Sequence, residues 1–541
     1  MITRVSAQRL LGGITAGRAA ADYVVVYGVA GLGGRLLAAV GSCRGCASML
    51  AISSGRARVA SALSGIMLLL WGVLALGPAP ASAVVRAPTA ARSLEMSAVF
   101  AQPSYSPGEV ARVRVVADAT RLTVQPIAAF SSSDSAHAPI AGDPPVGPAR
   151  TVSWHRGSGT LTVAIGWWPS GVYFVRVTGG GGEVLAPLVV RPARLGQATV
   201  AVIVPTYTWQ AYNRRGGDSW YVCSCVHTVD LTRPYLDGGV PYNFGTYDRG
   251  FLQWLARNNV RVDVLADEDL DRIATGAELR RLYRMVVFES HSEYVTRHIF
   301  DITQQYRDLG GHLAFLSAND FFRDVVISGS SMTLIGRWRD LGRPEAALLG
   351  AQYLDWYRGV YPSRPYRIVG AHRVPWLFAG TGLSNGGQIP GYYGIEIDAT
   401  TSASPPGTIV VSTIPDIFPG ETAEMTYYTT AAGAEVFDAG TINFGGTAGN
   451  PYVAGMLANL WTHMSGVTVP CPPTPTSART STTGSSHRLL TRRMRTVRAA
   501  SPVLTPRPTA ARRAAGRQRV PGLPRRGPRR DRARAQGPPR M

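Results

Sequence analysis

The clearest hydrophobic pattern in the chain is a strand, loop, helix and second strand within residues 285–317. The uninterrupted apolar run Met285–Phe288 predicts a buried strand, because a parallel strand covered on both faces is apolar throughout. Apolar positions then recur at the 4-3-4-3 spacing of a helix face, at Val295, Ile299, Ile302, Tyr306 and Leu309. Gly310-Gly311 is a typical helix end, and 312–317 is apolar enough for the next strand.

Between the first strand and the helix lies the polar run His291-Ser292-Glu293-Tyr294. In open α/β sheets ligands bind beyond the carboxyl ends of the strands. A histidine and a carboxylate two residues apart are therefore placed for chemistry at that edge. The other interpretation is a polar loop with a carboxylate that caps the helix.

The same alternation of strands and helices extends over residues 197–468, which we interpret as an α/β domain. Strands are expected at 199–204 and 260–265, with a helix around 251–255 between them. Later strands are expected at 409–413, 424–429 and 433–442, and a closing helix at 453–464. This pattern predicts a doubly wound, mostly parallel sheet covered by helices on both faces.

Residues 84–194 are predicted to contain an all-β domain. Short β-branched stretches alternate with turns rich in Gly, Pro and Ser, such as 106–109 and 179–182. The predicted strands are 111–117, 122–126, 159–165, 172–178 and 185–191. Their spacing favours a small β-sandwich, which precedes the α/β domain.

The N-terminal region has the pattern of an export signal at residues 56–83. Arg56 and Arg58 precede an 18-residue apolar run, 59–76, and Ala81-Ser82-Ala83 forms an A-x-A-like cleavage site. We expect cleavage after Ala83 and a secreted protein; an uncleaved single-pass membrane anchor is the alternative. Residues 1–55 form an anomalous extension, either a true one or the result of a start assigned too early.

The charge of the chain lies at its ends. All 55 basic residues are arginine, and the net charge is +21. Residues 1–60 carry +6 and 488–541 carry +16, whereas 61–487 carry −1. A neutral folded part gives no support for nucleic-acid binding. The Pro- and Arg-rich tail, 470–541, cannot bury a core and is expected to be disordered.

The cysteines are consistent with export. Cys223, Cys225 and Cys471 follow the expected cleavage site. Because Cys223 and Cys225 are only two residues apart, we expect one of them to pair with Cys471, which leaves one spare thiol.

Several segments, taken in order and spacing, resemble the C-terminal region of the large (beta) subunit of N,N-dimethylformamidase and its relatives. The resemblance covers roughly residues 160–465. Its segments are 205–213, 216–219, 290–294, 316–319, 338–339, 343–345 and 348–353. The resemblance implies an α/β domain of the class I glutamine-amidotransferase type joined to β-rich modules.

The resemblance further implies a mononuclear iron site that hydrolyses an amide. Glu293, Tyr212 and Tyr173 would be the metal ligands, and His291 would act as the general base. Phenolate and carboxylate oxygens suit a hard cation such as Fe(III). Because Tyr173 falls in the predicted sandwich, the site is expected at the junction of the two domains. On sequence alone a tyrosine in such a sandwich is more often a core or edge aromatic residue than a metal ligand, and this alternative applies to Tyr173.

The family's second glutamate has no assured match here. Thr429 stands at the corresponding spacing, and Glu424 or Glu435 are the acidic alternatives. Two other polar groups have ordinary interpretations: the acidic run 267–271 as a solvated loop and helix start, and Asn319-Asp320 as a helix N-cap. Ser290 and Ser292 lack the glycines of a nucleophile elbow, and no cysteine lies within 288–293, which disfavours covalent amidotransferase chemistry.

Two hypotheses for function follow. The first is a secreted, iron-dependent amide hydrolase that takes a small-molecule amide and activates water at a Tyr/Tyr/Glu site. The second is a non-catalytic, exported cell-surface or glycan-binding protein on the same fold. The sequence leaves open whether the chain acts alone or as a homo-oligomer, and a membrane is a partner only if the signal is uncleaved.

Overall fold

The computed structural model describes residues 95–129, 144–217, 219–221, 225–356, 364–391 and 395–471. The chain divides into two units, Met1–Ala91 and Arg92–Met541, and every described residue belongs to the second. The predicted extension and export signal, and the predicted tail beyond residue 471, lie outside the described residues. Of the helices that the structure describes, none has the length and apolar character needed to cross a bilayer.

The first part of the described chain consists of two β-sheets. One has the order β1-β3-β6 and the other the order β2-β8-β7-β4-β5. The strands are β1 Ser97–Phe100, β2 Ser104–Tyr105, β3 Val110–Ala117, β4 Arg121–Ala128, β5 Arg150–Ser153, β6 Gly157–Ala164, β7 Gly171–Gly179 and β8 Gly182–Val190. All five strands predicted here are confirmed within a few residues.

Strand β7 separates two hydrophobic cores because its side chains alternate. Tyr173 and Val175 belong to the core enclosed by the two sheets. Val172 and Phe174 face the other way and belong to a core that extends into the rest of the protein, where Phe174 meets Phe244 edge-on at 5.3 Å between ring centroids. Successive residues of a strand point to opposite faces, so neighbours in sequence serve different cores.

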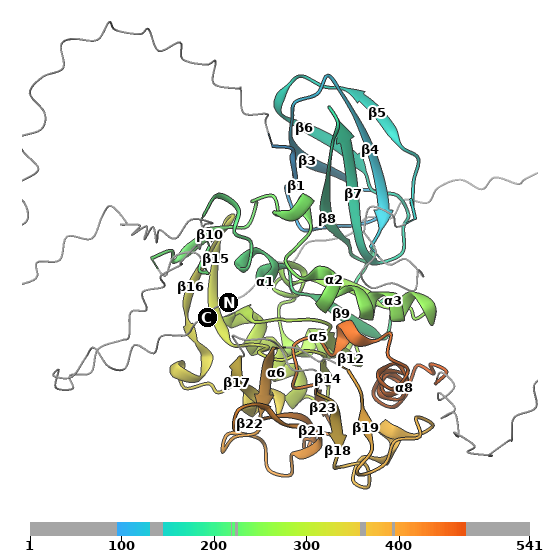
Figure 1. The fold of residues 1–541 in the computed structure, drawn as a ribbon, viewed down its shortest axis with the longest axis vertical. Helices are drawn as coiled ribbons and strands as arrows, with labels where there is room; N and C mark the ends of the chain where they lie inside the picture. Colours follow the sequence, from blue (N-terminus) through green and yellow to red (C-terminus); the bar gives the residue numbers. More distant parts are fainter. Residues whose placement is uncertain are drawn as a thin grey trace, which may run out of the picture. The chain divides into compact units, whose positions relative to one another are not determined.

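The second part is built on a nine-stranded sheet of order β11-β9-β12-β14-β23-β22-β21-β18-β19 (Figure 1). The first five strands are parallel, and the pairings from β23 to β19 are antiparallel. The strands are β9 Val200–Val204, β11 Asp263–Ala266, β12 Met285–Phe288, β14 His312–Phe315, β18 Tyr366–Ile368, β19 Gln388–Ile389, β21 Ile409–Phe418, β22 Glu421–Thr429 and β23 Glu435–Asp438.

Helices cover both faces of the parallel strands. Val200, Val202 and Val204 of β9 pack with α3 (Arg249–Arg257) and α8 (Pro451–Leu460). Ala201 and Ile203 of β9 pack on the opposite side with α5 (Gly276–Leu282) and α6 (Arg297–Asp308). The continuous apolar run in β9 is explained by this two-sided burial.

Smaller elements complete this part of the chain. A four-stranded sheet has the order β10-β16-β15-β13, and β17 pairs with β20. The strands are β10 Thr228–Asp230, β13 Tyr294–Thr296, β15 Arg323–Ser328, β16 Ser331–Arg337, β17 Gln352–Trp356 and β20 Glu396–Ala399. Short helices are α1 Thr206–Ala211, α2 Phe244–Tyr247, α4 Asp267–Leu270 and α7 Ala346–Leu349. Single turns are η3 Arg215–Gly217, η4 Asp237–Gly239, η5 Trp338–Leu341, η6 Pro375–Phe378, η7 Gly445–Thr447 and η8 Trp461–Ser465.

The protein is therefore β-rich, with several sheets, and the expected mostly parallel sheet is correct for only part of its width. β21 and β22 are joined by Pro419-Gly420, with Gly420 at φ 85°, and so short a connection forces an antiparallel pair. The acidic run also differs from expectation. It forms α4, but Asp267 and Asp269 are buried rather than solvated, because they accept hydrogen bonds from Tyr207 N and Ala266 N.

Candidate active site

The site lies beyond the carboxyl ends of β9 and β12, two strands that pair with each other. Helix α1 follows β9 directly and ends at Tyr212. The loop after β12 carries His291 and Glu293 into β13, and Thr208 of α1 accepts a hydrogen bond from Tyr294 N at 3.2 Å. The predicted position of the polar run at the sheet edge is confirmed.

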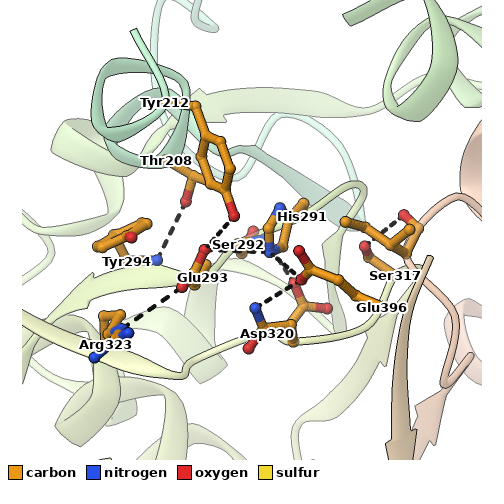
Figure 2. Close-up of polar contacts among 12 residues, drawn as sticks. Thr208, Tyr212, His291, Ser292, Glu293, Tyr294, Ser317, Asp320, Arg323 and Glu396 are labelled. Atoms are coloured by element: carbon orange, nitrogen blue, oxygen red, sulfur yellow. Dashed lines mark hydrogen bonds and ion pairs between the residues drawn. The ribbon is translucent and has the colours of Figure 1, made fainter. Parts of the chain in front are cut away.

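One carboxylate oxygen of Glu293 accepts hydrogen bonds from two tyrosine hydroxyls. Tyr212 donates to Glu293 Oε2 at 2.8 Å and Tyr221 donates to the same atom at 3.1 Å. The Tyr294 hydroxyl lies 2.5 Å from that of Tyr221. In Figure 2 the Tyr212 hydroxyl points down to Glu293, and Arg323 lies on the other side of Glu293. Arg323 Nε is 3.7 Å from Glu293 Oε1.

His291 lies between two glutamates. Its Nε2 is 3.5 Å from Glu293 Oε2 and 3.4 Å from Glu396 Oε2 (Figure 2). The ring is buried, and Nε2 has no hydrogen-bond partner among the described residues. A buried nitrogen without a partner, between two acids, is available to exchange a proton with a bound molecule.

A tight loop after β14 holds both sides of this arrangement. Asn319 Nδ2 donates to Glu396 Oε2 at 2.7 Å, and Asp320 Oδ1 accepts from Ser292 N at 2.6 Å. Asn319 and Phe321 have φ values of 58° and 57°, a left-handed conformation that asparagine tolerates but that is costly for phenylalanine. No helix starts here, so the predicted N-cap role of Asn319-Asp320 is wrong: their polar groups hold the site instead.

Tyr212, His291 and Glu293 line a cavity of about 330 Å³. Its polar groups include His291, Glu293, Asn319, Arg323 and Glu396, and its aromatic groups are Trp209, Tyr212, Tyr221, Tyr242, Tyr247, Phe322, Tyr353 and Trp356. All of its lining residues fall within 205–442. The cavity therefore lies inside the α/β part of the protein, and the expectation of a site at the junction with the sandwich is wrong.

Burial disfavours the charged form of each group, so it raises the pKa of the acids and lowers the pKa of the histidine. Burial, followed by the charge of Glu293, raises the pKa of Glu396 to about 8. Burial lowers the pKa of His291 to about 3, so the imidazole is neutral at neutral pH. Burial also raises the pKa of Glu293, against the lowering effect of Arg323, and raises the pKa of Tyr212 and of Tyr221.

The structure brings Tyr212, His291 and Glu293 together and separates Tyr173 from them. Tyr173 packs in the sandwich core, its ring 5.2 Å from that of Trp168, and its hydroxyl donates to Pro169 O at 2.7 Å. The prediction of Tyr173 as a ligand in this site is wrong, because the alternation of β7 turns it inward. Tyr221 is the second tyrosine that reaches Glu293.

The residues considered for the second acid also lie elsewhere. Thr429 is exposed at the end of β22, and Glu424 accepts hydrogen bonds from Thr400 N and Oγ1. Glu435 accepts from the Tyr427 hydroxyl at 2.7 Å and pairs with His463. Glu396, at the start of β20, is the acid beside His291.

Sequence reasoning missed Tyr221, Asn319 and Glu396 as site residues. Tyr221 lies two residues after the family-like segment 216–219, and Asn319 is the last residue of the segment 316–319. The resemblance to the family could therefore have pointed to both. Glu396 stands in the sequence Ile-Glu-Ile-Asp, where acids alternate with isoleucine at the start of β20, and that alternation was the available signal.

The candidate metal ligands in this cavity are the side-chain oxygen atoms of tyrosine and glutamate. Among the described residues, no three His, Cys, Asp or Glu side chains are arranged to hold a metal ion. A metal site here would thus depend on the phenol oxygens that meet at Glu293. The predicted pairing of Cys471 is wrong, because Cys471 is a free thiol, whereas the expected disulfide is present at Cys225. Cys471 packs instead near the Ala379 carbonyl and Gly455 of α8.

Comparison with known proteins gives one consistent family. Residues 117–454 match the family described as "N,N-dimethylformamidase beta subunit-like, C-terminal". The N,N-dimethylformamidase beta subunit of Alcaligenes sp is 29% identical over 140 residues, which is 26% of this chain. The match covers 18% of the length of that relative.

Similarities to solved structures are weak. The matches include a beta-glucosidase from Listeria innocua, with 15% identity, a TM-score of 0.13, and coverage of 18% of this chain and 16% of that one. A cycloisomaltooligosaccharide glucanotransferase from Paenibacillus sp. has 10% identity, a TM-score of 0.16, and coverage of 64% and 68%. Neither supports an argument about function.

The family match covers more than half of the 541 residues and includes every side chain of the site just described. This chain belongs to the N,N-dimethylformamidase beta subunit-like, C-terminal family.

Proposed function

We propose that this protein is a metal-dependent hydrolase of the C–N bond of amides. The observation that carries the proposal is the convergence of the Tyr212 and Tyr221 hydroxyls on one oxygen of Glu293, at 2.8 and 3.1 Å, beside the unpartnered Nε2 of His291. Membership of the dimethylformamidase-like family supports the same reaction class.

The proposed metal is a single Fe(III) ion held by Tyr212, Tyr221 and Glu293. Three hard anionic oxygens match a hard trivalent cation. Burial opposes ionisation of both phenols, so they would lose their protons only in the presence of a strong positive charge. When bound, the ion would supply Lewis acidity to the substrate carbonyl and to water.

His291 and Glu396 have complementary properties for proton transfer. The neutral imidazole can accept a proton at Nε2, and the carboxylate of Glu293 would then stabilise the imidazolium. Glu396, with its pKa raised to about 8, is protonated at neutral pH and can donate to the departing amine nitrogen. Two groups whose pKa values are pushed apart are suited to the roles of base and acid.

The test is the metal content and absorption spectrum of the purified protein together with formate release from formamides. We expect about one iron per chain and a visible tyrosinate charge-transfer band, both lost in Glu293→Ala. His291→Asn should retain the iron and lose roughly 10²–10⁴-fold in kcat. Iron-free protein with undiminished amidase activity would refute the metal assignment, and absence of hydrolysis in iron-loaded protein would refute the function.

Two finer assignments belong to the same proposal. The first is the class I glutamine-amidotransferase type of fold, supported by the strand order β11-β9-β12-β14-β23 with helices on both faces. The second is export after cleavage at Ala83, supported by the pattern of residues 56–83. N-terminal sequencing of secreted protein tests the second.

A non-catalytic glycan-binding protein is the second candidate. It is favoured by Trp167, which is 84% exposed and lines a separate cavity of about 630 Å³ with Trp168 and Arg261. Titration with cell-wall polysaccharide separates the two candidates. Binding that is lost in Trp167→Ala, without amidase activity, would favour this second function.

A further inference from the structure

The opening of the active-site cavity is lined by exposed aromatic rings. Tyr221, Tyr242 and Trp356, which we call the aromatic mouth, are 42%, 45% and 39% exposed. Among the strongly exposed large hydrophobic residues that the structure describes, only four are aromatic, and three of them line this cavity. Exposed apolar groups gathered at one place typically mark a ligand-binding surface.

The rings of the mouth are continuous with the reactive end of the cavity. Tyr221 stacks on Tyr212 with ring centroids 4.2 Å apart and planes at 23°, and Tyr242 stacks on Tyr212 at 5.7 Å with parallel planes. The Tyr212 hydroxyl in turn reaches Glu293. A flat aromatic group laid on these rings would therefore be held next to Glu293 and His291, with the offset stacking that such rings favour.

The cavity is also larger than a minimal formamide needs. Its volume of about 330 Å³ lies in the range of pockets that enclose drug-sized ligands. N,N-dimethylformamide, with two methyl groups on nitrogen, would leave most of the aromatic surface in contact with water.

Arg214 carries a positive charge beside the aromatic mouth. Arg214 lines the cavity, is exposed, and holds its guanidinium 5.8 Å from the centre of the Tyr242 ring. Within the described ranges no acidic side chain forms an ion pair with it. Its charge is available to an anionic group on a ligand.

We propose that the preferred substrate is an N-aryl amide whose ring carries an acidic group. The acyl group lies against His291, Glu293 and Glu396, the ring lies on the aromatic mouth, and the acidic group faces Arg214. The acyl end of this assignment rests on the proposed hydrolase function. In the reaction water adds across the C–N bond, its oxygen going to the acyl carbon and its protons to the acid and amine products, which are formate and an aromatic amine for a formanilide.

The experiment is a calorimetric titration of the full-length protein with three probes: N,N-dimethylformamide, formanilide and 4-formamidobenzoate. Stacking should make formanilide bind about three- to tenfold more tightly than N,N-dimethylformamide. The carboxylate should add about two- to fivefold at low ionic strength, and added salt should remove that gain.

Substitutions at the mouth should affect the two gains separately. Trp356→Ala and Tyr242→Leu should each reduce the preference for formanilide, whereas Arg214→Gln should remove only the carboxylate gain. Trp167→Ala is the matched aromatic control, since Trp167 is 84% exposed and lies outside this cavity. Arg367→Gln, at an exposed arginine of β18, is the control for charge.

Equal affinity for formanilide and N,N-dimethylformamide, or a carboxylate gain that survives Arg214→Gln, would overturn the proposed ligand class. Formate release is measured in parallel with the same probes. Tight binding of 4-formamidobenzoate without hydrolysis of any probe would refute the hydrolase and retain the ligand class. Hydrolysis of all probes without the expected order of affinity would do the opposite.

Discussion

A single atom, Glu293 Oε2, organises the candidate site at the residue scale. It accepts hydrogen bonds from Tyr212 and Tyr221 and lies 3.5 Å from His291 Nε2. Such a buried acid, with three polar neighbours on one oxygen, is costly unless the neighbours or a ligand compensate for lost water. Tyr173, by contrast, satisfies its hydroxyl locally with Pro169 O.

Two conservative substitutions separate these tyrosines. We expect Tyr221→Phe to reduce bound iron and amidase activity, because it removes one of the oxygens that meet at Glu293. Tyr173→Phe should leave both unchanged and lower the free energy of unfolding by about 1 kcal/mol through loss of one buried hydrogen bond. Metal analysis and urea unfolding of both variants provide the measurements. Loss of iron in Tyr173→Phe alone would contradict this assignment.

At the scale of elements, glycines set how closely the backbones around the site approach one another. Gly250 in α3 faces the carbonyl of Gly446 in η7, and a side chain at Gly250 would collide with that carbonyl. η7 starts three residues after Ile442, which lines the cavity. Close backbone contact of this kind requires glycine.

Gly250→Ala should therefore destabilise the protein, although alanine normally stabilises a helix by about 1 kcal/mol relative to glycine. We expect a net loss of about 1–3 kcal/mol, as for other overpacked positions. Gly449→Ala is the control, because no atom lies near the added carbon there and its φ is not positive. The midpoints of thermal unfolding are compared. Equal midpoints for the two variants would mean that the α3–η7 contact adjusts freely.

Helix α4 brings an acid into a partly buried position next to α1. Glu268 Oε2 accepts from Thr206 Oγ1 at 2.7 Å, and burial raises the pKa of Glu268 to about 7 from its usual 4.5. A raised acid pKa means that the folded state holds the proton more tightly than the unfolded state. The associated stability is fully present below pH 4.5 and is lost as the pH rises towards 7.

Glu268→Gln should remove this loss while it retains an acceptor for Thr206. At pH 8 we expect the variant to be more stable than the wild type by about 1–3 kcal/mol, and at pH 4 the two should be similar. Urea unfolding at several pH values measures the difference. A constant difference from pH 4 to pH 8 would show that Glu268 does not titrate in this range.

At the scale of the whole molecule, one hydrophobic core joins the sandwich to the α/β part. Val172, Phe174 and Val189 of the sandwich strands belong to the same core as Trp209 and Phe244. Polar contacts add to it: Ser104 Oγ donates to Asp269 Oδ1 at 2.7 Å, and Val264 N donates to Ser170 Oγ at 2.8 Å. We infer that these regions of the described chain unfold together.

Removal of the shared side chain tests this coupling. Phe174→Ala should cost about 3–5 kcal/mol and split the single calorimetric transition into two, because the cavity forms in the core that links the parts. Phe100→Ala is the comparison, since Phe100 is buried in the sandwich core alone. It should lower the transition without splitting it. Two transitions already present in the wild type would disprove the coupling.

How far the sequence predicted the fold can be judged from particular elements. β9, β12 and α6 were predicted correctly. Each strand is a continuous apolar run and the helix has a regular apolar spacing, and such patterns follow directly from which side chains are buried. The antiparallel half of the sheet was not predicted, because strand direction depends on the connections and not on the strands themselves. The sequence pattern predicts Asp267 and Asp269 as solvated, because it does not show their distant partners: Tyr207 is 60 residues from Asp267, and Ser104 is 165 residues from Asp269.

The sequence by itself determined the polar run His291–Tyr294 at the end of a buried strand, because hydrophobic periodicity and chain direction place it there. The sequence pattern also placed Tyr212 at the same edge, because Tyr212 follows shortly after the buried strand β9. Only the tertiary structure decided which further side chains join them. Tyr221 and Glu396 reach His291 and Glu293 across separations of 72 and about 100 residues, and the inward face of β7 keeps Tyr173 away. Local patterns carry burial and register, whereas convergence of distant side chains depends on how the loops and sheets pack.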